Sequence, residues 1–117
     1  MEKIDIVAFI RLLVEQTEKG KCDWQNDKKG FRLILKNGSV KFNYSFDDMT
    51  QGYEYTLSLY DTTELFAIYY VDNADAFDAA LFPEMEKLRQ TIQKWQEALT
   101  NEKIKVLYGE LKAKKTE

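Results

Sequence analysis

The stretch from Phe31 to Val71 constrains the fold more than any other part of the chain, because apolar and polar residues alternate along it. A period of two residues is typical of β-strands with one buried face. Most of the aromatic residues of the chain also lie in this stretch. The pattern divides into four short strands and predicts an antiparallel meander.

The first hairpin of this meander is predicted from the dipeptide Asn37-Gly38, which favours a type I′ turn. A two-residue loop at this place pairs Leu35 with Val40, Leu33 with Phe42 and Phe31 with Tyr44. All of these residues are apolar, so one face of the hairpin is expected to be buried.

The second hairpin is expected to join Tyr53–Tyr60 to Leu65–Val71 through the loop Asp61–Glu64. Pairing across this loop sets Leu59 against Phe66, Leu57 against Ile68 and Tyr55 against Tyr70. The opposite face then carries a second apolar strip, which consists of Tyr60, Leu65, Ala67, Tyr69 and Val71. Another element of the chain or a partner is needed to bury this second strip.

A helix is predicted before the sheet, from Lys3 to Lys19, with Gly20 as its end. Its apolar face holds Ile6, Val7, Ile10, Leu13, Val14 and Thr17. Phe9 and Leu12 widen this face. A wide apolar face indicates that the helix is buried between the sheet and another helix, in preference to a surface that binds a partner. In the connector that follows, Trp24 is expected to seal the edge of the core.

The residues after the sheet predict helices. A short turn is expected from Asp72 to about Leu81, followed by a helix with Pro83 in its first position and by a third helix that starts near Thr100-Asn101. The second of these helices has a seam that consists of Leu81, Met85, Leu88, Ile92, Trp95 and Leu99. The expected fold is therefore one α+β domain, residues 1–117, with an N-terminal helix, a four-stranded antiparallel β-meander and two to three C-terminal helices packed on the sheet.

The composition argues against several kinds of chemistry. Cys22 is the only cysteine and there is no histidine, so neither an internal disulfide nor a Cys/His zinc site can form. The acids near Asp72 and Asp75 do not have the spacing of a calcium loop, and the five glycines are scattered singly. We therefore predict no catalytic residues, no metal and no cofactor, and we expect that the protein is not an enzyme.

The N-terminal stretch from Met1 to Val14 is apolar, but charged residues interrupt it. A signal peptide or a membrane span requires a continuous apolar stretch. We therefore expect a cytoplasmic protein that has no contact with a membrane.

The leading functional hypothesis comes from the strip formed by Tyr60, Leu65, Tyr69 and Val71. Contiguous exposed apolar patches mark association sites, so the sequence predicts a small non-enzymatic module that binds another protein or a second copy of itself. The alternative within the monomer is that the third C-terminal helix folds over the strip.

Two other functions are compatible with parts of the sequence. A single-stranded nucleic acid could meet Arg32, Lys36 and Lys41 with its phosphates and stack bases on Tyr60 and Tyr69. The net charge of −3 argues against this platform. The same charge would suit an acidic inhibitor or immunity-like protein, although no particular motif selects that class.

Overall fold

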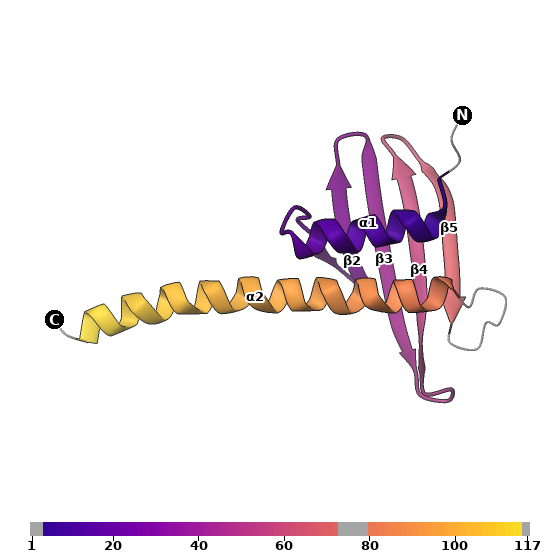
Figure 1. The fold of residues 1–117 in the computed structure, drawn as a ribbon. Coiled ribbons are helices and arrows are strands. Elements are labelled where there is room, and N and C mark those ends of the chain that lie inside the picture. Colours follow the sequence, from indigo (N-terminus) through magenta and orange to yellow (C-terminus); the bar gives the residue numbers. More distant parts are fainter. Residues whose placement is uncertain (1–3, 73–79, 116–117) are drawn as a thin grey trace.

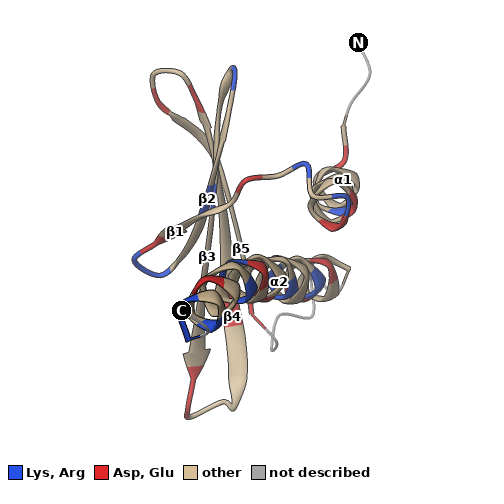
Figure 2. Ribbon diagram, turned by 90° about the vertical axis from the view of Figure 1, so that its left-hand side faces the viewer, with Lys and Arg blue, Asp and Glu red and all other residues tan. Residues whose placement is uncertain are grey.

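The computed structural model describes residues 4–72 and 80–115. It has an α+β fold with an N-terminal helix, one sheet of five antiparallel strands and one long C-terminal helix (Figure 1). The elements are α1 (Ile6–Glu18), β1 (Gln25–Asp27), β2 (Gly30–Leu35), β3 (Gly38–Asp47), β4 (Gly52–Asp61), β5 (Leu65–Asp72) and α2 (Leu81–Lys115). Both helices lie on the same side of the sheet, as the view from the side shows (Figure 2).

Helix α1 matches its prediction closely. The side chain of Asp5 caps it by accepting a hydrogen bond of 3.0 Å from the backbone N–H of Val7. The helix ends before Gly20, whose φ of 74° only glycine adopts without strain. Its buried residues are Ile10, Leu13, Val14 and Thr17, and the helix packs beside α2.

The prediction of four strands was wrong by one, because the connector contributes the short strand β1. Trp24, which precedes β1, is buried as expected, and its indole N–H donates a hydrogen bond of 2.9 Å to the Thr17 hydroxyl. This anchor on α1 brings the next three residues alongside β2. Strand β1 consists of polar residues, so no alternation of apolar and polar residues predicted it.

In the first hairpin, the predicted turn was displaced by one residue. Lys36 and Asn37 form the turn, and the described residues with positive φ are Gly20 and Gln51, so the turn is not of type I′. The observed pairs are Leu35 with Gly38, Leu33 with Val40 and Phe31 with Phe42. Because this pairing differs from the predicted one by two residues, every side chain keeps its predicted face.

Gly38 has a different role from the predicted one. A Cβ atom at this position would lie 2.1 Å from the carbonyl oxygen of Tyr60 on the neighbouring strand β4. Gly38 is therefore required by the close approach of two strands and not by the conformation of a turn.

In the second hairpin, the predicted register was wrong by one residue. The observed pairs are Leu59 with Ala67, Leu57 with Tyr69 and Tyr55 with Val71, and an irregularity between Leu59 and Tyr60 absorbs the extra residue. A shift of one residue turns a strand over. Tyr69 and Val71 therefore face the helices, whereas Ile68 and Tyr70 face away from them.

One continuous helix of 35 residues replaces the two to three predicted C-terminal helices. Pro83 lies in its first turn, where a missing backbone N–H costs little. The expected second start at Thr100-Asn101 does not interrupt the helix, and neither does Gly109. The expected short turn between Asp72 and Leu81 lies largely outside the described residues.

The two halves of α2 have different surroundings. Its first half buries Leu81, Met85, Leu88, Arg89 and Ile92 against the sheet and α1. From residue 97 to residue 115 every residue is exposed, and this α2 extension projects beyond the sheet (Figure 1). The alternative in which the third C-terminal helix folds over the apolar strip is therefore not what the structure shows.

Candidate functional site

The face of the sheet that no helix covers is the main candidate surface, and we call it the open face. Its residues form cross-strand rows. One row consists of Ile34, Ser39, Tyr60 and Leu65, the next of Arg32, Lys41, Ser58 and Ile68, and the third of Gly30, Asn43, Thr56 and Tyr70. Its β5 side is apolar, whereas its β2 and β3 side is mixed and carries the cations.

The structure separates the four residues that were predicted to bind a partner. Tyr60 and Leu65 lie on the open face as expected. Val71 is fully buried under the helices, and Tyr69 packs against the same core. The predicted strip Tyr60, Leu65, Tyr69 and Val71 is therefore not one surface.

Ile68 and Tyr70 replace the two buried residues on the open face. Their exposed fractions are 57% and 50%. The predicted register placed both of them on the buried face, because Leu65–Val71 is apolar at every position and either register buries apolar residues. No alternation distinguishes the two faces of this strand, so the sequence held no signal for the correct one.

The three cations of the nucleic-acid alternative are only partly brought together. Arg32 and Lys41 are cross-strand partners, while Lys36 lies in the turn beyond them. The carboxylate of Asp27 lies 3.6 Å from the Lys41 ammonium and 4.0 Å from Arg32 Nε. The backbone N–H of Lys28 first, and these two cations next, hold the pKa of Asp27 below its ordinary value. The pair is thus partly neutralised within the molecule.

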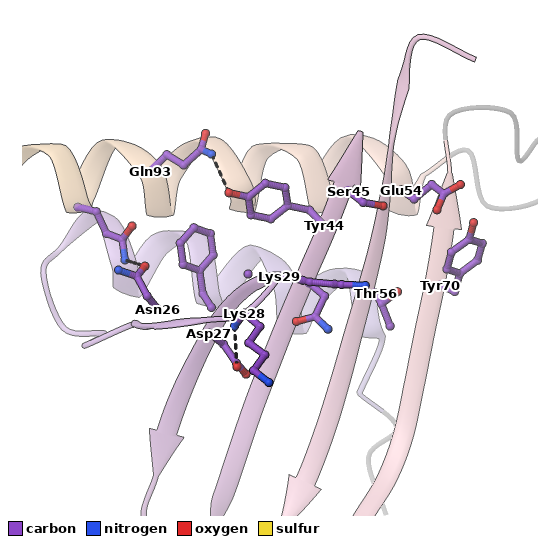
Figure 3. Close-up of a pocket in the computed structure, with 14 residues that line it drawn as sticks. Asn26, Asp27, Lys28, Lys29, Tyr44, Ser45, Glu54, Thr56, Tyr70 and Gln93 are labelled. Carbon is purple, nitrogen blue, oxygen red and sulfur yellow. Dashed lines mark hydrogen bonds between the residues drawn. The ribbon is translucent and has the colours of Figure 1, made fainter. Parts of the chain in front are cut away.

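A polar hollow of about 720 Å³ opens beside this ion pair (Figure 3). The turn between β1 and β2 forms one wall, and residues of β3, β4, β5 and α2 form the others. Gln93 on α2 donates a hydrogen bond of 3.3 Å to the hydroxyl of Tyr44, and Gln96 donates one of 2.9 Å to Asn26. These contacts tie α2 to the sheet at the rim of the hollow.

Most of the residues that line the hollow are polar. The side-chain oxygen of Asn43 is buried there and accepts no hydrogen bond within the described structure. Glu54 and Tyr70 lie near each other on neighbouring strands (Figure 3). Burial first, and the carboxylates of Glu54 and Asp72 next, raise the pKa of Tyr70.

Other chemical features give little further guidance. Cys22 is buried, so its thiol is not offered to a substrate. Within residues 4–72 and 80–115, no three His, Cys, Asp or Glu side chains gather in a way that could hold a metal ion. No helix in the described part of the chain is both long and apolar enough to cross a lipid bilayer.

The open face, and its β5 side in particular, is therefore the best candidate for a functional surface.

Comparisons with known proteins found no matching family model, no similar curated protein and no similar solved structure.

Proposed function

We propose that this protein is a small non-enzymatic module that acts by binding another protein, and that the open face provides the contact surface. The observation that carries the proposal is the placement of both helices on one side of the sheet, which leaves apolar side chains of the other side exposed. The apolar members are Ile34, Tyr60, Leu65, Ile68 and Tyr70. Exposed contiguous apolar residues are typical of association sites, and tyrosine is enriched in them.

The bound protein is either a second copy of this chain or a different protein. A cytoplasmic location also remains a prediction from the sequence. The nucleic-acid alternative gains no support, because Asp27 partly neutralises Arg32 and Lys41.

The proposal can be tested with a photo-cross-linking amino acid placed at position 68 in cells that make the protein. We expect a discrete adduct, whose mass distinguishes a second copy from another protein. The matched control places the same group at position 106, because Val106 is similarly exposed at 63% but lies on the α2 extension. An adduct that is absent at position 68, or equally strong at both positions, would contradict the proposal.

A further inference from the structure

Strand β5 lies at one edge of the sheet. The strand order ends at β5, and among the described residues the backbone of Leu65–Val71 forms hydrogen bonds with β4 alone. Within residues 4–72 and 80–115, the N–H and C=O groups on its other side have no backbone partner. Such a row of groups is a template on which another strand can form.

This edge lacks the usual protection against pairing. Natural sheets blunt their edges with lysine, proline or inward-pointing charges. None of these occurs between Leu65 and Val71, where every residue is apolar. The opposite edge differs, because it consists of the short polar strand β1 and the end of β2.

A groove runs beside the free edge and could receive the side chains of an added strand. Its volume is about 460 Å³, and the starts of both helices form its walls together with β5. The lining residues are Asp5, Ile6, Val7, Ile68, Tyr69, Tyr70, Ala80 and Leu81. Successive side chains of a strand point to opposite faces, so every second residue of an added strand would enter this groove and the others would extend the open face.

The charges around the edge are acidic. Strands β4 and β5 contain no lysine or arginine, and they carry Glu54, Asp61 and Asp72. Glu64 precedes β5, and Asp5 lines the groove. Three hydrogen bonds from Thr63 and Glu64 hold the Asp61 carboxylate in place and lower its pKa. Both ends of the free edge therefore present negative charge.

This charge pattern disfavours a second copy of β5 as the occupant. Two antiparallel copies centred on Ile68 would place Glu64 opposite Asp72 of the second copy at each end. Like charges directly opposite one another destabilise a strand pair. The pattern instead suits a strand whose ends are basic.

We propose that the free edge of β5 binds an extended segment of another protein, with apolar residues at alternate positions and Lys or Arg on both sides. The inference rests on the proposed function and specifies its partner. Main-chain hydrogen bonds supply the affinity in this mode of recognition. The groove and the acidic residues at both ends of β5 would determine which amino-acid sequences of the bound segment are preferred.

The experiment measures the binding of fluorescent synthetic peptides to the full chain by anisotropy. The panel contains strand-forming peptides of alternating apolar and polar residues with two lysines at each end, together with versions that carry glutamates at the ends. A third version carries N-methyl groups on every second backbone nitrogen, which removes donors without changing the charge. We expect binding of the lysine peptides, weakened by salt, and at least tenfold weaker binding of the other two versions.

Two protein variants locate the binding site. Ile68→Lys places on β5 the kind of charge that protects natural edges, and we expect it to weaken binding at least tenfold. Val106→Lys makes the same change at a similarly exposed position of the α2 extension and should leave binding unchanged. Hydrogen exchange should also slow at β5 amides, and not at β1 amides, when the lysine peptide binds.

Each contrary result overturns a defined part of the inference. Equal binding of the N-methylated peptide would exclude strand pairing, and equal binding of the glutamate peptide would exclude selection by charge. If no lysine peptide binds while the cross-linker at position 68 still captures a protein, the open face binds by another mode and only the edge inference is wrong.

Discussion

The Nε atom of Arg89 donates a hydrogen bond of 2.9 Å to the hydroxyl oxygen of Tyr55, and this contact joins α2 to the middle of the sheet. Tyr55 is fully buried and Arg89 is only 9% exposed. The guanidinium also lies 4.1 Å from the centre of the Tyr53 ring and donates to the side chain of Gln93. A buried charge is tolerated where such partners replace water.

Replacing Tyr55 with Phe should destabilise the protein by about 1–3 kcal/mol, because it leaves a charged donor of Arg89 without its partner. Chemical denaturation followed by tryptophan fluorescence measures the free energy of unfolding. Tyr108→Phe is the matched control, since Tyr108 lies on the exposed α2 extension, and it should change nothing. Equal stability of both variants would show that the buried contact contributes nothing.

The stability should also fall at alkaline pH. Burial raises the pKa of Tyr55, although the hydrogen bond and charge of Arg89 oppose this effect. A folded-state pKa above that of the unfolded chain gives stability that is complete below about pH 10 and is lost as the pH rises through the folded-state pKa. Unfolding free energies measured between about pH 9 and pH 11 should fall less in Tyr55→Phe than in wild type. A fall of the same size in both proteins would assign the effect to other groups.

The register of β5 can be tested with two neighbouring residues. Val71→Ala should cost about 2 kcal/mol, because the side chain is fully buried. Tyr70→Ala should cost much less, since half of that side chain is exposed. Thermal or chemical unfolding measures both, and the reverse order of costs would support the register in which Tyr70 faces the core.

The close approach of two strands makes a prediction for glycine. Gly38→Ala should destabilise the fold by about 1–3 kcal/mol, because the new Cβ atom would collide with the backbone oxygen of Tyr60. Gly109→Ala is the control: no atom lies within 4 Å of its Cβ position, and alanine favours a helix by about 1 kcal/mol. A stability of Gly38→Ala equal to that of wild type would show that the strands can separate at no cost.

The α2 extension should be dispensable for the fold. A chain that stops after Leu99 removes only exposed residues among those described, so its unfolding free energy should change by less than about 0.5 kcal/mol. Circular dichroism should show the loss of helix, while the unfolding midpoint stays the same. Unfolding of the shortened chain would show that the extension supports the sheet.

Much of the fold could be predicted because local patterns were strong. Helix α1 was found from the spacing of Ile10, Leu13, Val14 and Thr17 and from Gly20 at its end. The faces of the first hairpin were correct although its turn was not, since a displacement by two residues preserves alternation. The seam of α2 was correct from Leu81 to Trp95, whereas Leu99 is exposed. Local capping signals at Thr100-Asn101 were too weak to end a helix that has no proline there.

The residues of the candidate surface were predicted only in part. An uncovered apolar face was expected, and Tyr60 and Leu65 do lie on it. Tyr69 and Val71 were exchanged for Ile68 and Tyr70, because one residue of register separates the two arrangements. The acidic residues at both ends of the free edge of β5 were not predicted to lie together, since they come from separate loops and strands.

The sequence by itself determined where α1, the four strands β2 to β5 and the first half of α2 form, because period, glycine and capping act over a few residues. Only the tertiary structure decided which side of β5 is buried, since seven consecutive apolar residues fit either register. The packing of Tyr69 and Val71 beneath the helices, with the irregularity beside Leu59, selected one of them. That choice left Ile68 and Tyr70 on the side that no helix covers.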